Sequence, residues 1–120
     1  MSSHPIVHIE IPATNPTAAS SFYASLFGWS MTTEPQMDYT MFTAEGGPGG
    51  GLPKVDGANV KVGEVLISVG TDDIDATLAK AGSLGGRTLV AKTEIPGMGW
   101  YAIFSDPTGN RIGLFTGRPA

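Results

Sequence analysis

The chain begins with a short segment, residues 6–11, in which apolar residues occupy every second position. A period of two predicts a β-strand with one face on a core and the other face polar. His8 and Glu10 fall on the polar face, and three β-branched residues face the other way. We therefore expect both polar side chains to point away from the apolar core.

A helical pattern follows at residues 16–27. Asn15 is a preferred N-cap, Pro16 suits the first helical position, and Gly28 suits a left-handed helix end. Apolar residues recur at intervals of four along this segment, which is typical of a helix that packs on a sheet. They form two adjacent stripes: Ala18, Phe22 and Leu26, and beside them Ala19, Tyr23 and Phe27.

Two further strands are predicted at residues 29–33 and 38–43, before a glycine-rich segment. Residues 45–51 read EGGPGGG, which favours neither helix nor strand. We predict a loop there, either a mobile loop or a lid or backbone that lines a pocket, because long flexible loops often carry function. Residues 53–63 then predict a linker.

The second half of the chain repeats the pattern of the first. Val65–Arg87 matches Val7–Trp29 without a gap, 58 residues later. One copy is too small to bury its own apolar face, so we expect two copies to share one core and one cavity. The elements predicted in the second copy are a strand at 65–69, a helix at 74–84 capped by Asp72 or Asp73, strands at 88–91, 100–105 and 111–115, and a turn at 106–110.

Composition narrows the classes of function. The 120 residues carry a formal charge of -4 and no cluster of Lys and Arg, so we expect no nucleic-acid partner. No apolar run approaches the roughly 20 residues of a membrane span, and the first residues lack a signal-peptide pattern. We therefore expect a cytoplasmic protein with no membrane partner. The absence of cysteine excludes disulfides and thiolate metal sites.

Four segments carry a family resemblance: HIEIP, FYASLFGW, DDIDATLAKAGSLGG and YAIFSDPTGNRIGLF. In this order and spacing the chain resembles the vicinal-oxygen-chelate superfamily of glyoxalase I, bleomycin-resistance proteins and extradiol dioxygenases, and in particular its glyoxalase-like branch. The resemblance implies an α+β fold in a single domain of two tandem βαβββ modules, residues 5–52 and 64–116, joined by the linker 53–63. It also implies a curved, cup-shaped mixed sheet with the helices on its outer face, and a homodimer.

For the metal-using members, the resemblance implies four metal ligands, two from each module. His8 suits such a position, since imidazole binds Zn, Ni or Fe(II). The ungapped repeat places Leu66 opposite His8, a shift of two residues places Glu64 there, and Gly113 stands where the last strand would supply a carboxylate. Glu45 lies early for a ligand from the first module. Because a catalytic site needs about three protein ligands, we expect no metal cofactor. A site that uses His8 and Glu64 is the alternative.

His8 and Glu10 are the candidate catalytic residues, because they share one strand face two residues apart. They would act as a general base and an orienting carboxylate, or as two polar anchors in an apolar pocket. The structural alternative is a partly buried His8 with satisfied hydrogen bonds and a Glu10 charge at the rim.

Five residues of the second module are candidate substrate contacts. Trp100 and Tyr101 are adjacent on a strand, so one of them faces the cup. Met98 would be an adaptable wall or a loop residue, and Arg111 would attract an anionic group or lie in solvent. Gly113 would leave room where the family's carboxylate stands.

Three functions remain open at this stage. The first is a protein that binds a small apolar or anionic molecule in its cup, resembling the bleomycin-resistance type and lacking the family's metal site. The second is a metal-dependent lyase or dioxygenase of the vicinal-oxygen-chelate type. The third is a non-enzymatic interaction subunit. If the protein is an enzyme, the resemblance implies a lyase, isomerase or dioxygenase.

Overall fold

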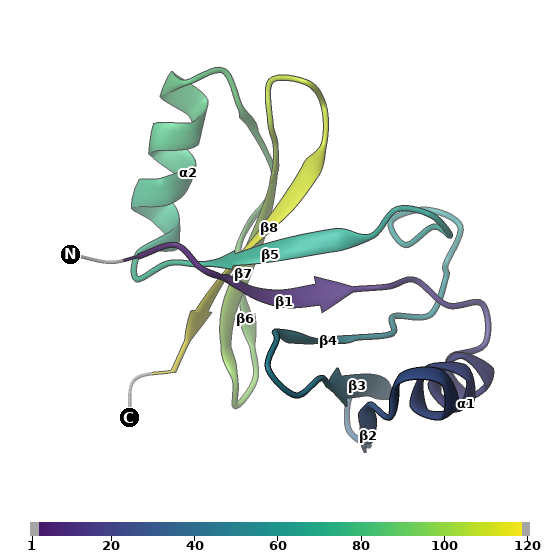
Figure 1. Cartoon of the computed structure of the whole chain (residues 1–120). Helices are drawn as coiled ribbons and strands as arrows, with labels where there is room; N and C mark the ends of the chain where they lie inside the picture. The colour runs from purple at the N-terminus through teal and green to yellow at the C-terminus, as the bar shows by residue number, and fades with distance from the viewer. Residues whose placement is uncertain (1–2, 119–120) are drawn as a thin grey trace. The chain divides into compact units, whose positions relative to one another are not determined.

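The computed structural model describes residues 3–118 (Figure 1). Its first half contains β1 (Ile6–Glu10), α1 (Pro16–Phe27), β2 (Ser30–Glu34), β3 (Tyr39–Thr43) and β4 (Gly49–Gly51). Its second half contains β5 (Leu66–Gly70), α2 (Ile74–Ser83), β6 (Arg87–Ile95), β7 (Gly99–Ser105) and β8 (Arg111–Gly117). The predicted α+β class and the repeated βαβββ order are confirmed.

Contacts divide the chain into two compact units. One unit is His8–Leu66, and the other combines the residues before His8 with those from Ile67 onward. Each unit mixes parallel and antiparallel strand pairs. Neither α1 nor α2, the helices in residues 3–118, is long and apolar enough to cross a membrane.

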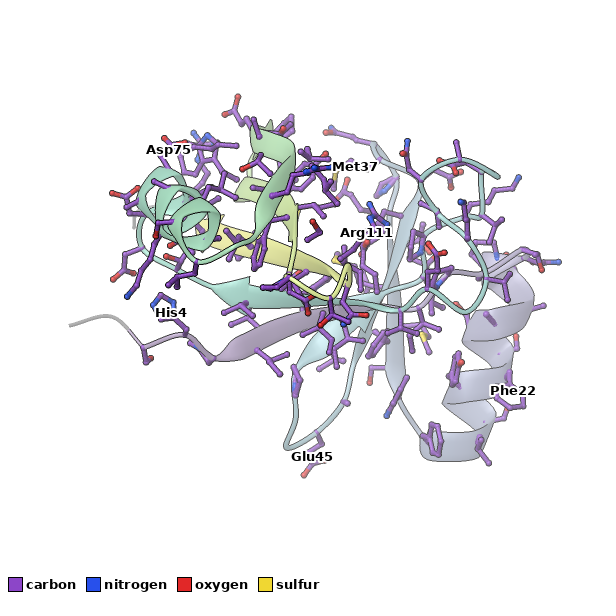
Figure 2. All side chains as sticks on the ribbon, turned by 90° about the horizontal axis from the view of Figure 1, so that it is seen from above. His4, Phe22, Met37, Glu45, Asp75 and Arg111 are labelled. Atoms are coloured by element: carbon purple, nitrogen blue, oxygen red, sulfur yellow. The ribbon has the colours of Figure 1, made fainter. Side chains whose placement is uncertain are left out.

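In the unit His8–Leu66 the strand order is β2-β3-β4-β1, with β1 parallel to β4. Aromatic rings join α1 to this sheet: Tyr23 stacks on Trp29 at 5.3 Å between ring centroids, and Trp29 stacks on Phe42 at 4.4 Å. Of the two predicted helix stripes, Ala19 and Tyr23 pack against this core. Phe22 is 59% exposed and points away from the helix on its outer side (Figure 2).

The ends of α1 follow from local chemistry. The Asn15 side chain accepts a hydrogen bond from the backbone N–H of Ala18 (3.1 Å), and Pro16 occupies the first helical position. Gly28 ends the helix at φ 74°, a left-handed conformation that favours glycine. Both predicted ends of this helix, Pro16 and Phe27, are therefore confirmed.

The prediction of a loop for the whole segment 45–51 was wrong, because Gly49–Gly51 form strand β4. This strand lies between β1 and β3, with Ile9 opposite Gly50 on one side and Phe42 opposite it on the other. A Cβ atom at Gly50 would collide with the carbonyl oxygen of Ile9. Glycine is required here because the neighbouring backbones come so close together. The strand preference of glycine itself would not have predicted a strand.

In the other unit the strand order is β5-β8-β7-β6, with β5 parallel to β8. The Asp73 side chain caps α2 by accepting from the N–H of Ala76 (3.0 Å). The helix packs Ile74 against Ala102 and Leu114 of the sheet. The remaining side chains packed on this cluster are Val69, Leu78, Trp100 and Phe104.

Strand β6 is longer than the predicted strand at 88–91 and extends to Ile95. The added residues Lys92, Thr93 and Glu94 are polar and exposed. The sequence therefore shows no alternation of apolar and polar residues there that would predict a strand. They are held in the strand by pairing with β7, as in Thr93 opposite Tyr101. An edge strand of this kind is specified by its neighbour rather than by burial.

The predicted turn at 106–110 is confirmed, and its carboxylate organises it. Asp106 Oδ1 accepts from the N–H groups of Thr108, Gly109 and Asn110, each at 2.9 Å. These bonds lower the pKa of Asp106, with Asn110 the largest cause. Asp56 makes the same set of bonds to the three N–H groups of residues 58–60 in the predicted linker, which therefore has ordered structure.

We predict that Gly50→Ala destabilises the protein because the new methyl group has no space between β1 and β3. The expected loss is about 2 kcal/mol or more in the free energy of unfolding. Thermal and urea unfolding would measure it. Gly47→Ala is the matched control, since no atom lies within 4 Å of a Cβ there. Equal stability of the two variants would contradict the close approach of these strands.

Candidate functional site

The main polar cluster of the unit His8–Leu66 joins three side chains by two hydrogen bonds. The Tyr39 hydroxyl donates to Glu10 Oε2 at 2.6 Å. His8 Nε2 lies 2.9 Å from the same hydroxyl oxygen. The rings of His8 and Tyr39 stack with 6.3 Å between centroids. The sequence prediction that His8 and Glu10 share one strand face is therefore confirmed, and Tyr39 connects them.

Strand register brings this cluster together. His8 lies opposite Gly49 and Glu10 lies opposite Gly51, so the neighbouring strand presents no side chains between them. A Cβ atom at Gly51 would overlap the hydroxyl and ring of Tyr39. Because β4 consists of three glycines, the Tyr39 side chain can cross over it from β3 to the side chains of β1.

The direction of the hydrogen bonds follows from counting protons. A phenol has one proton, and Tyr39 donates it to the Glu10 carboxylate, which is the stronger acceptor. The phenol oxygen can then only accept, so His8 must present Nε2–H to it. His8 is therefore assigned as the Nε2–H tautomer when it is neutral, which leaves a lone pair on Nδ1.

The surroundings keep His8 neutral and Tyr39 protonated. Burial lowers the pKa of His8 below 6.5, and the Glu10 charge opposes this effect only in part. Burial also raises the pKa of Tyr39, and both the charge of Glu10 and its hydrogen bond raise it further. At neutral pH the cluster therefore contains an uncharged imidazole and an uncharged phenol.

Two acceptor atoms of the cluster remain open to solvent. No hydrogen bond is made by His8 Nδ1 or by Glu10 Oε1 within residues 3–118. In that part of the chain, no buried or half-buried residue has a side-chain nitrogen or oxygen that is both hidden from solvent and without a hydrogen-bond partner. Since His8 and Glu10 are half-buried, both atoms must contact solvent. Both atoms are therefore unused hydrogen-bond acceptors of the cluster.

The cluster does not fit the metal site that the resemblance implies. Only His8 and Glu10 are metal-ligand types there, and Tyr39 already takes one donor atom from each. No group of three or more His, Cys, Asp or Glu side chains suited to a metal ion occurs in the described part of the chain. Glu45 is exposed in the loop between β3 and β4 (Figure 2).

In the second module, the positions at which the resemblance implies ligands hold other residue types. Gly113 lies opposite Ser68 on β5, and a Cβ at Gly113 would meet the Ser68 hydroxyl. Leu66, the last residue of the unit His8–Leu66, begins β5, and Glu64 is exposed two residues before that strand. Neither Gly113 nor Ser68 can serve as the carboxylate or imidazole expected there.

The two adjacent aromatic residues of β7 take opposite faces. Trp100 packs on the cluster beneath α2, and the Lys92 ammonium lies 5.3 Å from its ring centroid. Tyr101 therefore lies on the face away from α2, opposite Phe115 of β8. Of the two, Tyr101 is the residue whose side chain is on the same face as Gly113.

The remaining candidate contacts lie near the ends of strands. Met98 is 39% exposed in the turn between β6 and β7. Arg111 begins β8 opposite Ser105, on the face shared by Gly113 and Tyr101. Within this unit the structure thus brings Tyr101, Arg111 and Gly113 to one face and places Trp100 on the other.

Tyr39 and Gly51 are site residues that the sequence did not reveal. Tyr39 was expected only as part of a strand at 38–43, and Gly51 only as part of a loop. Alternation along a strand tells which face a residue takes, but it does not tell which residues of other strands lie beside it. The run of three glycines after the strand that contains Tyr39 is the sequence signal that could have indicated both residues.

Two hollows are lined by residues outside this cluster. One of about 300 Å³ is lined mainly by apolar atoms of α2, the residues that follow it, β7 and the 106–110 turn, including Leu84, Phe104 and Pro107. Another of about 340 Å³ lies beside the start of α1, near Ala13 and Tyr23. Neither hollow has His8, Tyr39 or Glu10 among its lining residues.

Comparison with known proteins agrees with this fold. Residues 8–115 match the family model described as a glyoxalase-like domain. A member of the glyoxalase/bleomycin resistance protein/dioxygenase superfamily from Vibrio splendidus has a similar structure, with a TM-score of 0.66 at 15% identity over 95% of this chain and 99% of that chain. Streptomyces coelicolor methylmalonyl-CoA epimerase, in complex with 2-nitronate-propionyl-CoA, gives 0.68 at 24% identity over 95% and 97%. Both likenesses show the fold.

Among curated proteins, CFP32 of Mycobacterium bovis is 29% identical over 113 residues. The match covers 89% of this chain and 43% of that protein. The chain thus spans about two fifths of the length of the first curated relatives that it matches.

We predict that His8 makes stability depend on pH just below 6.5. Because the pKa of His8 is lowered, the unfolded chain binds more protons there than the folded chain. The free energy of unfolding therefore falls as pH drops through this range. His8→Gln should flatten this part of the curve of melting temperature against pH. Identical curves for wild type and His8→Gln would contradict the assignment.

Proposed function

Because the chain belongs to the glyoxalase-like domain family, we propose that it binds a small molecule at the cluster of His8, Tyr39 and Glu10, and that it does so without the family's metal ion. The observation that carries this proposal is the pair of solvent-accessible acceptor atoms, His8 Nδ1 and Glu10 Oε1, in an otherwise hydrogen-bonded cluster. The bound epimerase ligand supports small-molecule binding on this fold.

The chemistry available at the cluster is proton transfer. Neutral His8 can act as a general base through Nδ1, and the Tyr39 hydroxyl fixes the imidazole from its other side. Glu10 holds Tyr39 in place through a short charge-assisted bond. A positioned base of this kind contributes about 10²–10⁴-fold to a reaction rate. The proposed ligand is a small apolar molecule with a polar group that reaches His8.

The alternative of a metal-dependent lyase or dioxygenase is less well supported by the donor set. His8 and Glu10 are the two residues of suitable type in the cluster, whereas a catalytic metal site normally takes about three protein ligands. Elemental analysis of protein purified without chelators distinguishes the two functions. About one equivalent of bound transition metal would overturn the metal-independent proposal.

We predict that a screen of small phenols, aromatic carboxylates and acyl thioesters identifies ligands that perturb the backbone NMR signals of β1. His8→Ala should weaken their binding about tenfold, because it removes the proposed acceptor and a hydrogen bond contributes about 0.5–1.5 kcal/mol. His4→Ala is the matched control and should bind as the wild type does. If no compound shifts the signals of β1 or raises the melting temperature, the proposal fails.

A homodimer is also proposed, and α1 offers the surface for it. Phe22 and Leu26 are 59% and 58% exposed, and Phe27 is exposed beside them. The helix carries no charged residue, so two copies could meet there without like-charge repulsion. Neighbouring exposed apolar side chains are a feature of protein interaction surfaces.

We predict that replacing both Phe22 and Leu26 with Ser converts the dimer to a monomer. Light scattering at several protein concentrations would measure the mass. The double variant Thr32→Ser with Thr33→Ser, at exposed positions of β2, is the control and should stay dimeric. A wild-type chain that is monomeric at all concentrations would contradict the proposal.

A further inference from the structure

We propose that Glu10, Tyr39 and His8 form a proton relay that accepts a proton from an uncharged hydroxyl or enol ligand at His8 Nδ1 and delivers it to Glu10. This inference deepens the proposed function and rests on it, since the ligand must bind at the same cluster. It adds the direction of proton movement, the role of Tyr39 and the chemical class of the ligand.

The relay is continuous in the structure. The heavy atoms of its two internal links are 2.9 Å and 2.6 Å apart, which lies within normal hydrogen-bond range. The shorter link joins a phenol to a carboxylate, and its length is that of a charge-assisted bond. No bulk water is needed between the imidazole and the carboxylate.

The proton movement balances. The ligand O–H bond breaks, its proton forms an N–H bond at His8 Nδ1, and the electron pair stays on the ligand oxygen. The Nε2–H proton passes to the Tyr39 oxygen as the Tyr39 proton passes to Glu10 Oε2. His8 and Tyr39 end neutral, Glu10 ends as the neutral acid, and one negative charge has moved from Glu10 to the ligand.

This balance explains why an uncharged ligand is favoured. Glu10 is the charged group that acts on both His8 and Tyr39. A ligand that is already anionic would bring a second negative charge to a half-buried carboxylate and would have no proton to donate. A neutral hydroxyl or enol would instead donate to Nδ1 and gain charge only as Glu10 loses it.

Gly51 has a positioning role in this relay. Since a Cβ there would overlap the Tyr39 hydroxyl and ring, any larger residue must displace the central link. Gly51 therefore keeps the Tyr39 hydroxyl in its place in the relay, in addition to allowing the strands to pack closely.

Nitrogen NMR of the His8 imidazole tests the relay without any activity assay. We expect the wild-type protein to show the Nε2–H tautomer at pH 7.5. Tyr39→Phe should remove the acceptor and give a mixture of tautomers, whereas Tyr23→Phe, which removes a hydroxyl from the α1 core, should retain Nε2–H. A wild-type Nδ1–H tautomer, or a Tyr39→Phe spectrum identical to that of wild type, would overturn the relay.

Phenol and benzoate are the two ligand probes, since they share a ring and differ in the proton they can donate. We expect phenol to shift the Nδ1 resonance, to bind at least tenfold more tightly than benzoate, and to bind about tenfold more weakly to Tyr39→Phe than to Tyr23→Phe. Benzoate that binds more tightly than phenol would overturn the relay but not the proposed binding site. If neither these probes nor any screened compound perturbs β1, the proposed function itself fails, whatever tautomer His8 has.

Discussion

The close packing of β1, β4 and β3 is the constraint on which the rest of the site depends. Three consecutive glycines remove every side chain from the middle strand, so the Phe42 ring lies against Gly50 and the Tyr39 ring lies against Gly51. Phe42 thereby reaches the core beneath α1, while Tyr39 reaches His8 and Glu10. One bare strand thus serves both the hydrophobic core and the polar cluster.

The two units use the same order of elements for different surfaces. In the unit His8–Leu66, the sheet face away from the helix carries an imidazole, a phenol and a carboxylate. In the other unit, the corresponding face carries Ser68 and Gly113, with Tyr101 nearby on the same side. Both units therefore keep the same order of elements, and the hydrogen-bonded group of His8, Tyr39 and Glu10 belongs to the unit His8–Leu66. Fold membership alone would not have distinguished these faces.

Local signals predicted the helices well and the site only in part. The bounds of α1 follow from Asn15 and Gly28, because caps act within one turn of the chain. The strand β4 and the polar end of β6 could not be predicted, since both are held by neighbouring strands rather than by their own composition. Alternation placed His8 and Glu10 on one face, but the arrival of Tyr39 depends on the register of three strands. The cofactor and ligand expectations stay predictions.

The polar character of β6 has a consequence for how the protein behaves at high concentration. Strand β6 ends the order β5-β8-β7-β6, so within its unit one side of its backbone has no partner strand. A bare strand edge can recruit strands from other molecules and grow into insoluble fibres. Exposed Arg87, Lys92 and Glu94 oppose such growth, because each incoming chain would have to bring its own ionic groups alongside them. Neutralising these three side chains would therefore increase the rate of aggregation in solution without changing the folded structure.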